Sequence, residues 1–362
     1  MNSPTCIRTF EIKPLDIPLH APFGISGGAQ AAANNVLLTV ELADGTRGHG
    51  EAAPLPPYNG ETQAQALAAL ASARAWTIGR EAAPWRALGD EFRSRGGAQC
   101  GSAQCAFETA LLDALARRDG LPLWKTFGAA GAELETDMTV TTGSAADAAA
   151  AARAILARGI RMIKVKVGGA KGAPHDLARL AAIHEAAPES PLILDGNAGL
   201  TRTAAAELIR GLKARGIAPA LLEQWLPKDD LEGMRALGSE SGWLVAADET
   251  VTTAADAQRV VEAGAAGVIN IKLMKAGVAV ALDIAAVAHA GGVGLMIGGN
   301  VESILAMTMS ACFAAGQGGF RFADLDTPLF MAANPFSGGY ELRGGIISVA
   351  HIIAGHGVVP RV

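Results

Sequence analysis

With 362 residues, the chain exceeds one small domain and fits two domains or a barrel with an accessory domain; half its residues are hydrophobic, enough for a large core. Thirty Lys and Arg against 35 Asp and Glu give a net charge of −5 with no basic block, which argues against nucleic acid or an anionic membrane as the partner. Charged residues interrupt the apolar stretches well before the roughly 18 residues that cross a membrane, and the N-terminus lacks the pattern of a secretory signal.

The four cysteines predict neither a disulfide framework nor a zinc site. They are Cys6, Cys100, Cys105 and Cys312. Cys100 and Cys105 lie close together, but no second Cys/His pair accompanies them. We therefore expect reduced thiols and a cytoplasmic protein.

The first part of the chain predicts a small α+β domain. Val36–Leu42 is rich in β-branched and apolar residues, as expected of a strand. Ala/Leu periodicity in Ala64–Ala75 and in Cys105–Arg118 predicts two helices, and Gly128 closes the region.

From Thr136 onward, short apolar runs alternate with Ala-rich helical segments. The expected strands are Thr136–Thr141, Met162–Val167, Leu192–Leu194, Ala220–Glu223, Leu244–Ala247, Gly267–Ile271, Gly294–Ile297 and Phe320–Asp324. The expected helices between them include Ala145–Ala157, Thr203–Ala214, Ala254–Ala263 and Val278–His289. Eight such units predict a TIM-type barrel of the α/β class. Beyond the barrel, Gly338–Ser348 is expected to form a hairpin that returns to the first domain.

Two lysines share one face of the strand Ile163–Val167. Lys164 and Lys166 are two residues apart, and side chains alternate along a strand, so both point the same way. One interpretation is a half-exposed strand with solvated lysines. In a barrel, however, the face that avoids the helices is the interior, and functional groups gather at the C-terminal ends of the strands. We therefore expect both lysines in the barrel mouth.

Three carboxylates close three successive strands: Asp195, Glu223 and Asp248. Each could merely cap the helix that follows it. Three anions gathered at one barrel mouth would repel strongly and need a cation, and ligation by oxygen alone selects Mg²⁺. We therefore predict that these three residues bind Mg²⁺.

A further lysine follows on the sixth repeat, where Asn270 and Lys272 share the inward face. This strand lies well around the ring from Lys166, with the acids between them. A carboxylate substrate held on the metal would have one lysine on each side. Two bases on opposite faces of one carbon permit removal of a proton from one side and its return on the other.

These motifs resemble those of the muconate-lactonizing subgroup of the enolase superfamily, over nearly the whole chain. They are Lys164-Val165-Lys166, Asp195-Gly196-Asn197, Glu223-Gln224, Asp248-Glu249 and Ile271-Lys272-Leu273-Met274-Lys275. The resemblance implies a (β/α)7β barrel over residues 129–328, an N-terminal α+β capping domain over residues 1–128, and a C-terminal segment over residues 329–362 that returns to the capping domain.

The same resemblance implies roles for the polar residues. Lys166 and Lys272 would be the two acid/base catalysts, and Lys164 would help to hold the substrate carboxylate. Mg²⁺ on the three acids would stabilise the enediolate formed when the α-proton leaves.

The segment Ala323–Pro328 is similar to the Asp-x-Asp signature of dipeptide epimerases, in which two carboxylates receive the free α-ammonium group of the substrate. Asp324 and Asp326 would take this role, and the enzyme would invert the α-carbon of the C-terminal residue of an L,L-dipeptide by 1,1-proton transfer. The alternatives are two turn acids before Pro328, and a muconate-type cycloisomerase or N-acylamino acid racemase. A Schiff-base lysine enzyme and a barrel that only binds a ligand also remain open.

The family pattern also suggests secondary contacts and specificity. Gly299, Val301 and Thr141 would line the substrate pocket. The loop Pro22–Ala29 has no Arg or Lys, whereas relatives acting on Ala-Glu commonly have a basic residue there, so a small or apolar second residue is expected. Trp225 replaces the Pro usual in the family, which leaves the shape of that loop open. Whether copies of the chain form a homo-oligomer is also left open.

Overall fold

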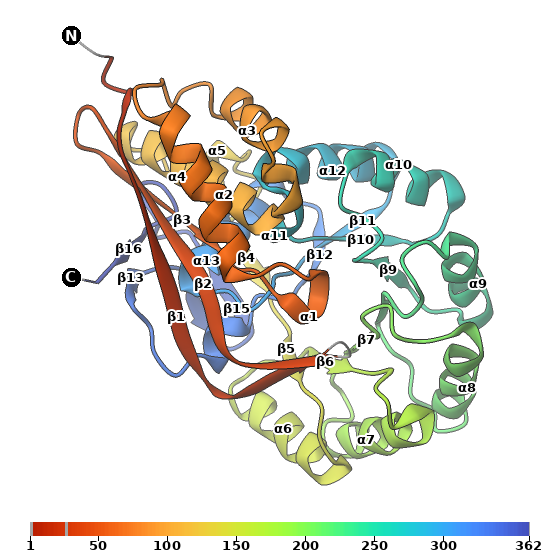
Figure 1. Ribbon diagram of the computed structural model, residues 1–362. Helices are drawn as coiled ribbons and strands as arrows, with labels where there is room; N and C mark the ends of the chain where they lie inside the picture. Colours follow the sequence, from red (N-terminus) through yellow and green to blue (C-terminus); the bar gives the residue numbers. More distant parts are fainter. Residues whose placement is uncertain (1–2, 26–27, 362) are drawn as a thin grey trace.

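A computed structural model describes residues 3–25 and 28–361, and it contains a parallel barrel and a separate antiparallel sheet (Figure 1). Among the described residues, no helix combines the length and apolar character needed to cross a membrane. The tip of the antiparallel sheet reaches the barrel, where Phe23 lines the same pocket as barrel residues.

The N-terminal sheet is built from β1 (Ile7–Ile25), β2 (Gly28–Leu42) and β3 (Arg47–Ala52), in that order. Alternate residues of β2 are buried, because one face of this sheet packs on helices. The helices here are α1 (Pro56–Asn59), α2 (Gln63–Thr77), α3 (Trp85–Ser94), α4 (Gly101–Arg118) and α5 (Leu123–Thr126), with a 3₁₀ turn at Gly97–Gln99. The strand and both helices expected in this region are confirmed, although α4 begins four residues earlier than predicted.

Two glycines explain how closely β3 lies against α4. A Cβ atom on Gly48 would lie 2.2 Å from the carbonyl oxygen of Ala110, and one on Gly50 would lie 2.0 Å from that of Ala106. Only glycine permits this approach. The motif Gly48-His49-Gly50-Glu51 therefore fixes the packing of the capping sheet on its central helix.

The barrel confirms the expected alternation of strands and helices. Its strands are β5 (Met138–Val140), β6 (Ile163–Lys166), β7 (Leu192–Asp195), β8 (Leu221–Glu223), β9 (Val245–Ala247), β10 (Val268–Ile271), β11 (Gly294–Ile297) and β12 (Phe320–Ala323). Its helices are α6 (Ala145–Ala157), α7 (Gly172–Ala186), α8 (Arg202–Lys213), α9 (Leu231–Ser241), α10 (Ala254–Ala263), α11 (Leu273–Ala276), α12 (Val278–Ala290) and α13 (Ile304–Gln317). All neighbouring strands are parallel, and a bridge between Thr136 and Ala323 joins the last strand to the first.

The inward face of the strands changes from apolar to polar along each strand. Ile193, Leu221 and Ala246 form an apolar cluster with Val268, Met296 and Phe322 inside the barrel. Two residues after each of the first three stand Asp195, Glu223 and Asp248. Because side chains alternate, a residue two positions later lies on the same face and nearer the mouth. The apolar layer thus closes the barrel below the polar residues.

The C-terminal segment contains the expected hairpin. It forms from β14 (Glu341–Arg343) and β15 (Ile346–Ser348), and β15 pairs with β4 (Glu133–Glu135), which precedes the first barrel strand. The hairpin follows a 3₁₀ turn at Thr327–Phe330 and the strand β13 (Phe336–Gly338), which pairs with β16 (Val358–Pro360).

Later residues of this segment do reach α4. The buried His356 donates its backbone N–H to Asp113 (2.9 Å), and its Nε2 lies 3.0 Å from the carbonyl oxygen of His49. The domain limits themselves stay a prediction.

Candidate active site

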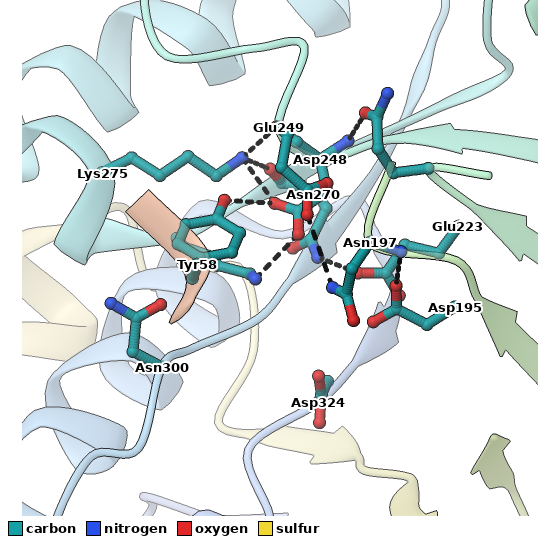
Figure 2. Close-up of polar contacts among 12 residues, drawn as sticks. Tyr58, Asp195, Asn197, Glu223, Asp248, Glu249, Asn270, Lys275, Asn300 and Asp324 are labelled. Carbon is teal, nitrogen blue, oxygen red and sulfur yellow. Dashed lines mark hydrogen bonds and ion pairs between the residues drawn. The ribbon is translucent and has the colours of Figure 1, made fainter. Parts of the chain in front are cut away.

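The candidate catalytic residues meet at the C-terminal ends of adjacent strands. Lys166 ends β6, Asp195 ends β7 and Glu223 ends β8, whereas Asp248 follows β9 and Lys272 follows β10. These five strands are consecutive in the sheet, so the three acids form a row along the barrel wall with one lysine at each end. Figure 2 shows the acids turned into the mouth, and all five side chains are buried. We call Asp195, Glu223 and Asp248 the acid row.

Lysines neutralise the first end of the acid row. Lys166 Nζ lies 2.6 Å from Asp195 Oδ2. Lys164 Nζ lies 3.0 Å from the same oxygen, 2.9 Å from Glu223 Oε2 and 2.6 Å from Asp324 Oδ2. Burial alone would raise the pKa of Asp195, but Lys164 and Lys166 hold it below its usual range. Burial would lower the pKa of Lys164, yet the surrounding carboxylates keep it well above its usual value, so Lys164 is a permanent cation here.

The other end of the acid row has its own pair of lysines. Lys272 Nζ lies 2.7 Å from Asp248 Oδ2, and Lys275 Nζ lies 2.8 Å from Asp248 Oδ1. Lys275 also donates to the carbonyl oxygens of Asp248, Val251 and Asn270, so it ties loops together. Burial would lower the pKa of Lys272, but Asp248 and Glu249 raise it above its usual range. Lys272 therefore begins as a proton donor, whereas Lys275 is committed to structure.

The acid row fits a divalent cation. It offers only carboxylate oxygens, the ligands that Mg²⁺ prefers. Glu223 Oε2 and Asp248 Oδ2 are buried and accept no hydrogen bond, and their close contacts are the ammonium groups of lysines. Asn270 Nδ2 orients the other oxygen of Glu223 from 2.8 Å. Burial and the charge of Asp195 raise the pKa of Glu223 to about 7 in spite of the nearby Lys164.

A second acidic cluster lies beside the first. Among residues 3–25 and 28–361, the three carboxyls that each place one oxygen within 4.8 Å of the other two are Asp137, Asp324 and Asp326 rather than the acid row. Asp326 Oδ2 accepts from the backbone N–H of Thr139 at 2.7 Å, and Asp324 pairs with Lys164. Neither oxygen of the buried Asp137 accepts a hydrogen bond. We call these three residues the carboxyl trio.

The three acids of the carboxyl trio differ in the direction of their pKa shifts. Burial would raise the pKa of Asp324, but Lys164 holds it below its usual value. Burial, reinforced by the charge of Asp324, raises the pKa of Asp326 to about 7 and that of Asp137 well above its usual range. One lysine compensates one carboxylate, which leaves two others that favour a proton or an additional cation.

Asp137 was not predicted from the sequence. It stands just before β5, and Asp137 and Thr139 lie on the same, inward face of the chain. Asp is depleted in strands, so its presence within the expected strand Thr136–Thr141 was the available signal. Its carboxyl neighbours come from a segment almost 190 residues later, which no local pattern reports.

A pocket opens above these residues, between the barrel mouth and the capping domain. Its polar wall contains Lys166, Lys272 and Asp324. Its apolar cover contains Phe23, Leu55 and Tyr58 from the capping domain. The pocket therefore joins a charged floor to an apolar lid.

Of the three residues expected to line the pocket, Gly299 does so, whereas Val301 and Thr141 make other contacts. Gly299 lies in the lining. Val301 instead packs in an apolar cluster, and its carbonyl oxygen accepts from Asn35 Nδ2 at 3.0 Å. Thr139 lines the pocket in place of Thr141, because β5 ends at Val140 and the carbonyl group of Thr141 binds Arg179 at 2.8 Å.

Trp225 takes a defined place in its loop. It is fully buried, and its Nε1 donates to the carbonyl oxygen of Leu194 at 2.8 Å. Gly196 makes room for it, since a Cβ atom there would lie 2.7 Å from Trp225 Cα. The bulky residue that departs from the family pattern thus braces the strand ends that carry Asp195 and Glu223.

Comparisons with known proteins agree with this geometry. Residues 7–128 match the model of the mandelate racemase/muconate lactonizing enzyme N-terminal domain, and residues 146–361 match that of the enolase C-terminal domain-like family. The chain is 50% identical to an aromatic dipeptide epimerase of Herpetosiphon aurantiacus over 98% of this chain and 99% of the relative. It is 33% identical to the L-Ala-D/L-Glu epimerase of Bacillus subtilis, over 95% of this chain and 94% of the relative.

A solved structure is also similar along its whole length. The dipeptide epimerase of Enterococcus faecalis in complex with Mg and the dipeptide L-Leu-L-Tyr superposes with a TM-score of 0.92 at 29% identity, covering 98% of this chain and 99% of that one. Both domains of the fold and the sequence relatives agree. The chain therefore belongs to the mandelate racemase and muconate lactonizing enzyme group of the enolase superfamily.

Proposed function

We propose that this protein is a Mg²⁺-dependent dipeptide epimerase that inverts the α-carbon of the C-terminal residue of an L,L-dipeptide. The observation that carries the proposal is the order of the sheet, which places Lys166 and Lys272 at opposite ends of the acid row. The identity to relatives named as dipeptide epimerases supports the same reaction.

The two lysines carry out a 1,1-proton transfer. One amine accepts the α-proton, and the electron pair of the broken C–H bond passes toward the substrate carboxylate. The ammonium group of the other lysine then gives its proton to the opposite face of the same carbon. No net proton or electron is consumed, and the configuration is inverted.

Asp195, Glu223 and Asp248 hold the metal in this proposal. Bound Mg²⁺ supplies Lewis-acid stabilisation of the negative charge that develops on the substrate carboxylate. Lys164 lies between Asp195, Glu223 and Asp324 and adds a fixed positive charge beside the same carboxylate. Burial of these charges strengthens their effect compared with that in water.

The carboxyl trio receives the α-ammonium group of the dipeptide. Three acids share one lysine there, so a further cation is favoured. An ammonium group has three N–H donors, and Asp326 Oδ1 and both oxygens of Asp137 are acceptors without a hydrogen bond. We therefore include Asp137 with Asp324 and Asp326 in the ammonium site.

The apolar lid sets the preference for the epimerised residue. Phe23, Leu55 and Tyr58 offer apolar and aromatic surface to its side chain. The described part of the loop Pro22–Ala29 contains no basic residue that would pair with an acidic side chain, and Ser26 and Gly27 lie outside the described residues. These features favour an aromatic or aliphatic second residue, in agreement with the aromatic preference named for the Herpetosiphon relative.

The carboxyl trio disfavours the other reactions. Muconates and N-acylamino acids carry no free amine to meet the carboxyl trio, and binding them would leave the acids that Lys164 does not neutralise without a cation.

A panel of L,L-dipeptides in D₂O with Mg²⁺, read by mass spectrometry, tests the proposal. Active dipeptides should gain one mass unit at the C-terminal residue and appear as both diastereomers. N-acetylated copies of the same dipeptides are the matched control and should react at least 100-fold more slowly, since the loss of a charge-assisted contact costs roughly 1.5–3 kcal/mol per hydrogen bond. Equal rates with and without the free amine would overturn the assignment.

We also propose a cytoplasmic location, which the four buried, unpaired cysteines support. Association of several copies into a homo-oligomer stays open.

A further inference from the structure

We propose that Tyr58 of the capping domain is the positioning residue for Lys272 and controls proton transfer on that face of the substrate. This inference rests on the two-lysine reaction proposed above. Tyr58 sits in the short helix α1, which starts with Pro56 at its first turn and stops at Gly60, whose φ of 80° reverses the chain. The helix thereby presents one side chain to the barrel mouth.

Tyr58 contacts both members of the ion pair at this end of the acid row. Lys272 Nζ lies 4.2 Å from the centroid of the Tyr58 ring, within the range of a cation–π interaction. The Tyr58 hydroxyl donates to Asp248 Oδ1 at 3.2 Å, while Lys272 itself pairs with Asp248 Oδ2. Figure 2 shows the tyrosine hydroxyl directed at Asp248.

The ring supplies a constraint that Asp248 alone does not. A lysine side chain has four rotatable bonds, and one ion pair fixes only the direction from its nitrogen to one oxygen. The Tyr58 ring is half-buried in the pocket wall and contacts the ammonium group from a second side. With two contacts, the nitrogen can no longer swing around the carboxylate oxygen. Removing the ring would let the Lys272 nitrogen leave the position from which it reaches the α-carbon.

The constraint acts on one side of the substrate. Lys166 Nζ lies 2.6 Å from an oxygen of Asp195. Among the described residues, Lys272 makes a cation–π contact with an aromatic ring, whereas Lys166 makes none. A role for Tyr58 that acts through Lys272 must therefore change proton exchange for one stereoisomer of the substrate more than for the other. A role in folding or in general substrate binding would change both alike.

The test compares Tyr58→Leu with Tyr58→Phe, which keeps the ring and loses the hydroxyl. Deuterium uptake in D₂O is measured at saturating substrate from each diastereomer of one active dipeptide. Lys272→Ala first identifies the diastereomer whose exchange depends on Lys272. Tyr58→Leu should slow exchange of that diastereomer about tenfold relative to the other, and Tyr58→Phe should leave the ratio within about twofold of wild type.

Phe23→Leu provides the matched control. Phe23 lines the same pocket, but its ring packs edge-on against Phe330 at 5.4 Å. This change should alter KM for both diastereomers and leave the exchange ratio unchanged. An unchanged ratio in Tyr58→Leu, or an equal fall for both diastereomers, would overturn the role of Tyr58 while wild-type epimerisation still stands. No exchange by the wild-type enzyme with any dipeptide would instead reject the proposed function.

Discussion

The acid row and the carboxyl trio are both groups of three buried acids in one barrel mouth, yet they differ in how far nearby lysines compensate their negative charge. Each end of the acid row faces lysines, and its acids come from three separate strands. The carboxyl trio is tighter, with one oxygen from each acid within 4.8 Å of the others, and it shares one lysine. The difference teaches that acidity alone does not identify a metal site. The spacing along adjacent strands favours a metal on the row, whereas the uncompensated trio favours the ammonium group of a substrate.

The largest effect should come from removing the lysine at one end of the acid row. Lys272→Ala should lower epimerisation by at least about 10³-fold, because the proton donor on one face is lost. Exchange of the α-proton should persist for the diastereomer that Lys166 deprotonates, as measured by deuterium uptake.

Lys171→Ala, at an exposed position, is the control and should behave as wild type. Equal loss of exchange for both diastereomers in Lys272→Ala would contradict a two-base arrangement.

The acid row should carry the metal affinity. Glu223→Gln should weaken Mg²⁺ binding by about 100-fold or more, measured by isothermal titration calorimetry, since one of three anionic ligands is lost. Glu249→Gln is the matched variant in the neighbouring acid. Burial and the charge of Asp248 raise the pKa of Glu249 to about 8, so glutamine resembles its neutral form and the affinity should change less than about threefold. A similar loss of Mg²⁺ affinity in both variants would contradict the assignment of Glu223, and not Glu249, as a metal ligand.

The carboxyl trio should control KM rather than metal binding. Asp326→Asn should raise KM for a free dipeptide by about 10- to 100-fold, because a charge-assisted hydrogen bond to the ammonium group is weakened. Asp137→Asn should raise it less, by about three- to tenfold, since burial already favours the neutral form of this acid. Steady-state kinetics check both, with Mg²⁺ affinity as the control. A fall in Mg²⁺ affinity in either variant would point to the trio as the metal site.

The smallest effect is a dependence of KM on pH. Burial and the charge of Asp324 raise the pKa of Asp326 to about 7, so this acid is charged above that pH and neutral below it. KM should therefore rise by up to about tenfold as pH falls from 7.5 to 6, a range in which the substrate amine, with a pKa of about 7.8, stays largely protonated. The groups around Asp326 include Asp324, Asp137, Lys164 and the N–H of Thr139.

The profile of Asp326→Asn should be flatter than that of wild type. If KM depended on pH equally in Asp326→Asn and in wild type, a group other than Asp326 would be responsible.

Much of the fold and of the site followed from periodicity. The eight barrel strands were expected within two residues of their observed ends, because an apolar strand face and an Ala-rich helix repeat are local signals. Asp195, Glu223 and Asp248 were predicted as a group because each stands at or directly after the end of an expected strand.

Contacts between distant segments were not predictable in the same way. Tyr58 reaches Lys272 from another domain, and Asp137 meets Asp326 across the closure of the barrel. Thr141 was expected in the pocket from the family pattern, but β5 ends at Val140 and Thr139 lines the pocket instead. The hairpin β14–β15 was expected from its own turn, but its partner β4 is a short segment more than 200 residues earlier.

A crystal structure with Mn²⁺ in place of Mg²⁺ and an L,L-dipeptide bound, with the metal located by anomalous scattering, tests the account most directly. We expect the ion on Asp195, Glu223 and Asp248, with the α-carbon between Lys166 and Lys272 and the ammonium group against Asp324 and Asp326. An ion within the carboxyl trio, or both lysines on one face of the α-carbon, would contradict the account.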